Sequence, residues 1–184
     1  MKMGENPTRN KHWLDIGCGN LVHEGCVGVD IDPASKADVI CDIEKWLPFQ
    51  DNMFENIYCH NIVEHSKNIF PLFEEIHRVW KKWAIVEIIV PHYSSRYARW
   101  DLTHIRPFSY DSFTCYGGQI PGFKIVSVKL MYIGANNAIL KYLLRIIFFV
   151  PYLLAFYMPR FFERFLCYLF GGIDYMKIMM KVTK

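Results

Sequence analysis

Two short apolar strands joined by a Gly-x-Gly loop constrain the fold of this chain more than any other feature. The first strand covers 13–16 and leads into Gly17 and Gly19, and the second covers 26–29 and ends in Asp30. Glycines let the backbone approach a ligand closely, and a carboxylate at the end of the second strand can accept hydrogen bonds from ribose hydroxyls. The pattern therefore predicts a pocket for an adenosine-type cofactor in an α/β fold.

Strand-like and helix-like segments alternate along the rest of the chain. Apolar residues at three- and four-residue spacing predict a helix after Asn68, and the nearly continuous apolar run 83–90 is typical of a central strand covered on both faces. Further strands are predicted over 37–41, 54–59, 124–132 and, more weakly, 176–182. This order predicts a Rossmann-like open twisted sheet of about seven mostly parallel strands with helices on both faces.

Composition and charge exclude several classes of protein. A chain of 184 residues with 52% apolar and 21% charged residues has the make-up of one folded domain rather than of a disordered chain. A net charge of +3, from scattered basic residues, does not favour nucleic acid as a partner. Six cysteines without a Cys-x-x-Cys pair indicate reduced thiols in a cytoplasmic protein, and we assign no metal ligand. No apolar segment typical of a secretory signal occurs at the N-terminus.

The spacing of the glycine loop separates two candidate cofactors. A dinucleotide site needs Gly-x-Gly-x-x-Gly and an acidic residue about twenty positions further on. Here Val22 takes the third glycine position, and Asp30 follows Gly19 by eleven residues. S-adenosylmethionine has no pyrophosphate and needs a tight turn, an acid for the ribose and a polar contact for the adenine. Gly17, Asp30 and Asp42 stand in that order at predicted strand ends, which favours S-adenosylmethionine over a nicotinamide cofactor.

The same segments resemble the class I S-adenosylmethionine-dependent methyltransferases, in particular the methyltransferase type 11 group, over about residues 13–132. The resemblance is carried by the glycine loop 14–20, the acidic strand 28–32, the adenine-side segment 41–49, the Asn61–His65 segment, and the helix and strand over 73–91. It implies that the cofactor is bound by Asp15, Gly17, Gly19, Asp30, Ile31, Asp42, Ile43 and Asn61.

The chain departs from this family in two ways. Trp83-Ala84 replaces the usual Pro-Gly-Gly turn before the fifth strand, so that turn must be built differently. The helices that usually precede the first strand and connect the second strand to the third are missing or very short, which predicts a more open cofactor pocket.

A polar and aromatic loop follows the strand over 83–90. Its segment 101–108 resembles the Asp-Pro-Thr-His-x-Arg-x-Phe segment of a subset of these methyltransferases, often linked to glycan or envelope biosynthesis, with Leu102 in place of the proline. An oxygen acceptor needs a base, so we predict His104 as the base, His92 as second choice, and Asp101 as the group that orients His104. Acceptor contacts are predicted for His65, Tyr93 and Arg106. A self-contained clasp of the loop, built by the same polar residues, is the competing interpretation.

The apolar segment 137–170 is unusual for an enzyme of this kind. Its pattern predicts two amphipathic helices, and its uncharged run is too short and too rich in proline for a membrane span. A lid or homodimer face and a peripheral membrane surface that receives a lipid-linked acceptor both fit this pattern. We expect a single domain over 1–184, with a cofactor-binding core over 13–132, an apolar helical insertion over 133–173 and a final strand over 174–184.

These observations predict a cytoplasmic S-adenosylmethionine-dependent methyltransferase, membrane-associated if the apolar segment lies on a lipid surface. Its predicted substrate is an oxygen of a small, lipid-linked or sugar-linked acceptor. Two alternatives stay open: a non-catalytic module that binds the cofactor or a membrane surface, and an NAD-dependent oxidoreductase.

Overall fold

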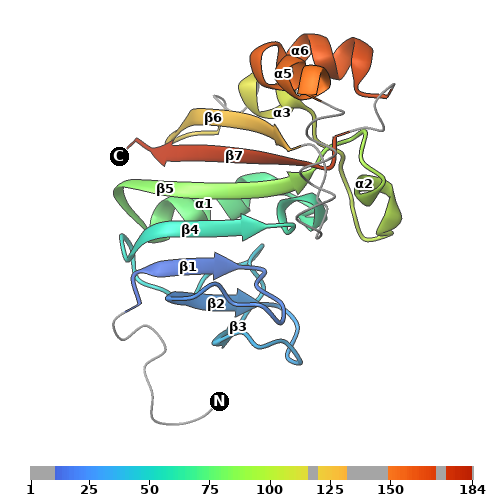
Figure 1. Cartoon of the computed structure of the whole chain (residues 1–184). Coiled ribbons are helices and arrows are strands. Elements are labelled where there is room, and N and C mark those ends of the chain that lie inside the picture. Colours follow the sequence, from blue (N-terminus) through green and yellow to red (C-terminus); the bar gives the residue numbers. More distant parts are fainter. Residues whose placement is uncertain (1–10, 116–119, 132–148, 169–172, 184) are drawn as a thin grey trace.

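One sheet organises the part of the chain that the computed structural model describes, residues 11–115, 120–131, 149–168 and 173–183 (Figure 1). It is seven-stranded, in the order β3-β2-β1-β4-β5-β7-β6. The first five strands pair in parallel, whereas β7 runs antiparallel to both β5 and β6. The bounds are β1 Trp13–Ile16, β2 Cys26–Asp30, β3 Val39–Ile40, β4 Phe54–His60, β5 Trp80–Pro91, β6 Phe123–Met131 and β7 Tyr175–Val182. The predicted open, mostly parallel sheet is confirmed.

The strand order places a switch point between β1 and β4. The chain leaves β1 towards β2 and β3 on one side, and it continues from β4 to β5 on the other side. In such sheets the crevice at the carboxyl ends of the two strands receives the ligand. The loops that follow β1, β2, β4 and β5 are therefore the ones that can build a site.

The helix α1, Ile69–Val79, supplies the main cover of the core. It begins at Asn68, whose side-chain oxygen accepts a hydrogen bond from the Phe70 backbone N–H at 3.2 Å. Its buried side chains pack against the buried residues of the sheet, and each contributes on the order of 2 kcal/mol to stability. They are Leu72, Phe73, Ile76 and Val79.

The two faces of the sheet are not equally covered. In β5 the side chains of Val86, Ile88 and Val90 are buried, whereas Ile85 is exposed and Glu87 half-buried. The run 83–90 is therefore not covered on both faces, although its sequence predicts that it is. Figure 1 shows α1 behind the sheet. The exposure of Ile85 and the partial exposure of Glu87 show that the face of β5 that carries them is partly open. Among the described residues, helices therefore cover one face of β5 more completely than the other.

The structure shows how the chain forms the two regions in which its sequence departs from the methyltransferase pattern. The loops 17–25 and 31–38, which join β1 to β2 and β2 to β3, contain no helix. Before the regular part of β5, Trp83 adopts a left-handed backbone with φ +71°. The register with β4 shifts there, from Phe54 opposite Trp80 to Asn56 opposite Ile85. A bulge within the strand thus replaces the Pro-Gly-Gly turn.

Short helices flank the β6 side of the sheet and its carboxyl ends (Figure 1). Their bounds are η1 Val63–His65, α2 Tyr97–Trp100, α3 Tyr110–Thr114, α5 Phe149–Tyr157, α6 Pro159–Phe161 and the π-helical turn η3 Phe162–Leu166. Of the predicted insertion over 133–173, the stretches 133–148 and 169–172 lie outside the described residues. None of the described helices is both long enough and apolar enough to cross a lipid bilayer.

Candidate functional site

A first cavity of about 260 Å³ lies beyond the carboxyl ends of β1, β2 and β4. Three loops build it: the glycine loop after β1, the acidic end of β2 with the segment after β3, and the turn that leads into η1. Its lining residues are Gly17, Asp30, Ile31, Asp42, Ile43, Glu44, Ile62, His65, Ser66 and Lys67. Five of the predicted cofactor residues therefore line one cavity, namely Gly17, Asp30, Ile31, Asp42 and Ile43.

The glycine loop is held in place by the backbone and by Asp30. Gly17 has φ +71°, and its N–H donates to the Val29 carbonyl oxygen at 2.8 Å. A Cβ at Gly17 would lie 2.6 Å from the Ile62 side chain, so the position has no room for one. Gly19 does not line the cavity, but its N–H donates to Asp30 Oδ2 at 2.7 Å. The loop and the carboxylate of Asp30 thus fix each other.

The acidic residues around this cavity have different surroundings. Asp42 is half-buried, and the hydrogen bond from the Lys45 ammonium group is the main cause that lowers the pKa of its carboxyl. Asp15 is buried and lies outside the cavity lining, because its Oδ2 binds the backbone N–H of His23 at 2.9 Å and the His23 ring Nδ1 at 2.7 Å. Asp15 therefore stabilises the loop between β1 and β2 instead of facing a ligand there.

A second cavity, of about 660 Å³, adjoins the first at the carboxyl ends of β4 and β5. His65 lines both cavities, and Asn61, predicted as a cofactor residue, lines only the second. The other lining residues come from η1, from the end of β5, from the 97–104 loop and from β7; they are Glu64, Pro91, Tyr97, Trp100, Asp101, Leu102, His104 and Tyr175. Two ligands, one in each cavity, would therefore both lie beside His65.

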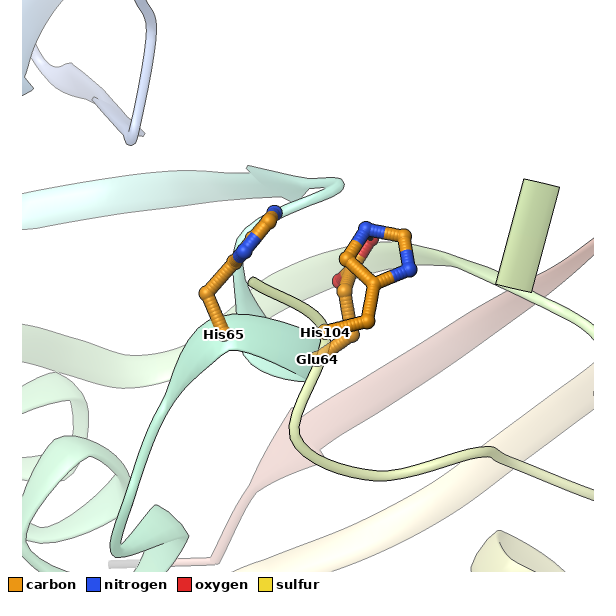
Figure 2. Close-up of side chains that lie close together, drawn as sticks. All are labelled: Glu64, His65 and His104. Carbon is orange, nitrogen blue, oxygen red and sulfur yellow. Dashed lines mark ion pairs between the residues drawn. The ribbon is translucent and has the colours of Figure 1, made fainter. Parts of the chain in front are cut away.

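Glu64, His65 and His104 form a compact group in the second cavity. Figure 2 shows Glu64 and His65 on the η1 segment, with the ring of His104 from the neighbouring loop beside the Glu64 carboxylate. His104 Nε2 lies 3.9 Å from Glu64 Oε1 and 4.0 Å from Asp101 Oδ2. The His65 and His104 rings meet edge to face, with their centroids 4.6 Å apart. The predicted proximity of Asp101 and His104 is present: the His104 N–H donates to the Asp101 carbonyl oxygen at 3.3 Å, whereas the side chains, 4.0 Å apart, form no hydrogen bond.

Burial changes the acid–base properties of this group. Glu64 is 1% exposed, and neither of its carboxylate oxygens has a hydrogen-bond partner among the described residues. Burial raises the pKa of Glu64 to about 7. Burial also lowers the pKa of His65, and the neighbouring His104 lowers it further.

The loop that carries His104 is clamped to the segment after η1. Arg106 donates two hydrogen bonds, to the carbonyl oxygens of Ser66 at 3.1 Å and of Lys67 at 2.8 Å. The Ile105 N–H donates to the Glu64 carbonyl oxygen at 2.9 Å. Arg106, predicted to contact the acceptor, is thus engaged in the clasp that formed the competing interpretation. His104 remains at the cavity wall.

His92 and Tyr93 lie away from both cavities. His92 is fully buried, and its Nε2 lies 2.7 Å from Glu163 Oε1 while its Nδ1 lies 2.8 Å from Ser94 Oγ. The Tyr93 hydroxyl donates to the Glu163 carbonyl oxygen at 3.3 Å. These contacts tie the loop after β5 to η3 and leave His92 no access to an acceptor. The role of second-choice base for His92 and of acceptor contact for Tyr93 is therefore not supported by their positions.

Sequence reasoning missed three kinds of residue in the second cavity. Glu64 stood beside His65 in the sequence, but its burial against His104 depends on how the distant loop folds back. Tyr97 and Trp100 lay in a loop recognised only as aromatic, and Tyr175 comes from β7, far away in the sequence. Tyr97 stacks on Tyr175 with ring centroids 5.4 Å apart. No periodic signal in the sequence marks such a pair.

Comparisons with known proteins agree with this architecture. The family model described as "Methyltransferase domain" matches residues 14–87. Similar solved structures include an S-adenosylmethionine-dependent methyltransferase from Archaeoglobus fulgidus, with TM-score 0.63 and 21% identity over 92% of this chain and 85% of that one. A putative methyltransferase from Bacillus halodurans has TM-score 0.61 and 15% identity, covering 94% and 92%.

A third similar structure is phosphoethanolamine N-methyltransferase 2 of Haemonchus contortus, solved with S-adenosylmethionine. It has TM-score 0.59 and 17% identity, and the match covers 93% of this chain and 48% of that one. The search of curated proteins finds no match. At these identities the solved structures establish the fold, and the family model adds the sequence pattern of the glycine loop and the segments that follow it.

Proposed function

We propose that the chain is a class I S-adenosylmethionine-dependent methyltransferase that transfers the cofactor's methyl group to an oxygen atom of an acceptor in the second cavity. One observation carries this proposal: the two cavities adjoin, and His65 lines both. A methyl donor bound in the first cavity and an acceptor bound in the second would therefore lie next to each other beside His65. Alignment of this kind is the main contribution of an enzyme to methyl transfer.

The residues of the first cavity fit S-adenosylmethionine. The Gly17 turn has no room for a side chain, Asp30 keeps lone pairs free to accept from ribose hydroxyls, and Asp42 lies where the adenine-side contact is expected. When bound, the cofactor supplies an electrophilic methyl group on a positively charged sulfonium. Both Asp30 and Asp42 line the first cavity, and in this proposal they bind and orient the adenosine part. Ile31, Ile43 and Ile62 give the same cavity apolar walls that exclude water.

His104 is the residue that we propose to accept the proton from the acceptor hydroxyl. Its side chain is only 10% exposed and lines the second cavity, and the Glu64 carboxylate 3.9 Å away would stabilise the imidazolium that forms. With the cofactor bound, the acceptor oxygen would form its bond to the methyl carbon as the carbon–sulfur bond breaks, the electron pair would stay on sulfur, and His104 would hold the proton. This balance produces a methyl ether and a neutral thioether.

The lining of the second cavity supports a ring-shaped acceptor. Tyr97 and Tyr175 stack on each other, and the ring centroids of Tyr97 and Trp100 lie 5.8 Å apart. The Arg96 guanidinium lies over both the Tyr97 and the Trp100 rings. Aromatic walls with a few polar groups are typical of sites for sugars and other flat or ring-shaped molecules. We therefore propose a hydroxylated ring, such as a sugar residue, as the methyl acceptor.

The exposed aromatic residues of the C-terminal helices support a lipid-linked form of this acceptor. Phe156, Tyr157, Phe161, Phe165 and Tyr168 are all exposed, and Arg164 lies among them. Aromatic and cationic side chains on one surface are typical of a peripheral contact with a membrane. We propose that α5 and the α6–η3 segment place the protein on a lipid surface; a homodimer through the same surface is the rival explanation.

The experiment that tests the proposed function measures the cofactor and the transfer separately. In calorimetric titrations we expect micromolar binding of S-adenosylmethionine and S-adenosylhomocysteine and none of NADH, with binding lost in Asp30→Ala. Incubation with methyl-labelled cofactor and a panel of sugars and phenols should then transfer label, and His104→Asn should reduce the rate by about 100-fold or more. Binding without transfer to any acceptor would favour the non-catalytic module instead.

A further inference from the structure

We propose that Glu64, His65 and His104 form a binding site for one divalent transition-metal cation, of the zinc, manganese or iron(II) type, in the wall of the second cavity. Each residue offers one ligand atom, and these atoms all lie within 4.8 Å of one another. Two histidines and one carboxylate on one side of a cation leave its remaining coordination positions open, which is typical of catalytic sites. Figure 2 shows the three side chains converging from η1 and the 101–106 loop.

The buried carboxylate of Glu64 is the first independent support for a cation. Both of its oxygens are inaccessible to solvent and have no hydrogen-bond partner among the described residues. A buried carboxylate without a partner is costly, and a positive ion bound between Glu64 and the two rings removes that cost. Among the described residues no lysine or arginine forms an ion pair with Glu64.

The surroundings of His65 are the second support, because they fix which ring nitrogen is free. The Thr103 hydroxyl lies 2.6 Å from Asp101 Oδ1 and 2.9 Å from His65 Nδ1. A hydroxyl has one proton, and an ionised carboxylate only accepts, so Thr103 donates to Asp101 and accepts from His65 Nδ1–H. His65 Nε2 therefore keeps its lone pair. Metal-binding histidines are commonly oriented in this way by a hydrogen bond at the other nitrogen.

The separations require only a small closure. Ligand atoms around a zinc-sized cation lie about 3 to 3.5 Å apart when each bond is about 2.1 Å. Glu64 Oε1 and His104 Nε2 are 3.9 Å apart, so a rotation of either side chain suffices for this pair. The backbone hydrogen bond from Ile105 to Glu64 already holds the two segments together.

A cation at this position would change how the acceptor is activated. An acceptor hydroxyl that completes the coordination has a lower pKa and releases its proton to water, so His104 then acts as a ligand and not as a free base. This consequence rests on the proposed methyl transfer. Cation binding itself does not, because it is measured without cofactor or acceptor.

The test uses the full-length protein after treatment with a chelator and dialysis, in a Cys115→Ser background so that the exposed thiol does not bind zinc. Zinc and manganese(II) chlorides are titrated by calorimetry, and bound metal is counted by elemental analysis after equilibrium dialysis. We expect one equivalent of cation per chain. Glu64→Gln and His104→Asn should each weaken its binding by about 100-fold, and Thr103→Ala, which removes the hydroxyl that holds His65 Nδ1, by about 10-fold.

Matched controls separate this site from general effects. Glu74→Gln changes an exposed glutamate on α1 and should leave cation binding unchanged. S-adenosylhomocysteine binding by the same variants reports whether the first cavity is intact, so failure of the metal site is distinguishable from failure of the proposed function. Absence of binding at about millimolar cation, or equal affinity in Glu64→Gln and wild type with both folded by circular dichroism, would overturn the proposal.

Discussion

At the scale of single residues, the two glycines of the loop after β1, two positions apart, allow a direct comparison. Gly17 and Gly19 both have positive φ, +71° and +53°, but only Gly17 lies against another side chain. Gly17→Ala brings a Cβ to 2.6 Å from Ile62 and fills the cavity wall. We expect it to abolish measurable S-adenosylmethionine binding in calorimetry and to destabilise the protein by about 2–3 kcal/mol in chemical denaturation.

Gly19→Ala is the matched control for this prediction. A Cβ at Gly19 meets no atom within 4 Å, so its cost is limited to the left-handed backbone, about 1 kcal/mol. Cofactor affinity should fall by less than about tenfold, since the N–H that binds Asp30 remains. Equal losses in the two variants would mean that backbone strain, and not the contact with Ile62, makes the loop depend on glycine.

Single residues also show which parts of the candidate site can be predicted from the sequence. Gly17, Asp30 and Asp42 are predictable because a strand end fixes each of their positions, whatever the rest of the chain does. His104 was found as a member of a polar loop. Its closeness to Glu64 was not, because that distance depends on the 101–106 loop being clamped to η1.

Polar loop residues were the least predictable group. His92 and Arg106 have the side chains that an acceptor site needs, but one is buried against Glu163 and the other binds two backbone carbonyls. A histidine or arginine in a loop can bind a substrate or hold the loop in place equally well. Only its partners in the folded structure determine which role it has. The aromatic rings of Tyr97 in α2 and Tyr175 in β7 stack across a long separation in the sequence, which local sequence does not encode.

At the scale of elements, a partly buried hydrogen-bond network joins α1 to the loop before β4. Arg78 donates to the carbonyl oxygens of Leu47 and Phe49 at 2.8 Å each and pairs with Glu75 at 2.7 Å. Glu75 in turn accepts from the Leu47 N–H at 2.8 Å. The helix was predictable from its periodicity and its Asn68 cap, whereas this network was not, because its partners in the loop follow no period.

This network predicts a pH-dependent stability. The hydrogen bond from Arg78 is the main cause that lowers the pKa of Glu75 below its ordinary value of 4.5. A carboxyl whose pKa is lower in the folded state stabilises the protein above its unfolded pKa, and the contribution is lost as the pH falls through the folded pKa. We expect Glu75→Gln to reduce the free energy of unfolding by about 1–2 kcal/mol at pH 7.

The difference between wild type and Glu75→Gln should shrink as the pH falls from about 5 towards 3, as measured by urea denaturation across that range. Glu74→Gln, one position earlier on the exposed face of α1, should show a constant and small difference at every pH. A Glu75→Gln difference that does not change with pH would show that shape and packing, rather than the ion pair, hold α1 to the loop.

At the scale of the whole molecule, the sheet and its site occupy one part and the apolar helices another. Figure 1 shows α5 and α6 beyond the β6 edge, on the side from which α2 and the 92–108 loop also project. A small buried cluster, including Ala155, Phe162, Cys167 and Ile173, holds these helices to the sheet through Leu130. This cluster buries only part of the apolar side chains of these helices, and several aromatic side chains on them stay exposed.

The membrane proposal makes a prediction at this scale. In co-sedimentation with vesicles that contain anionic phospholipid, we expect wild-type protein to bind and added salt to weaken the binding, because Arg164 lies beside the exposed rings. Replacing Phe156 and Phe165 together by serine should reduce the bound fraction by about tenfold or more, since each buried ring contributes on the order of 1–2 kcal/mol. Leu21→Ser, which changes an even more exposed apolar side chain in the loop after β1, should leave vesicle binding unchanged.

Sedimentation velocity of the same proteins distinguishes the membrane from a second copy of the chain. If the aromatic surface is a homodimer face, the wild type should sediment as a dimer at micromolar concentration, and the Phe156/Phe165 double variant should become monomeric without any vesicle present. If the surface serves the membrane, both proteins should sediment as monomers, and only vesicle binding should differ. A monomeric wild type that does not bind vesicles would contradict both explanations, and the second cavity with its aromatic walls would then be the surface among the described residues that we propose to recognise the substrate.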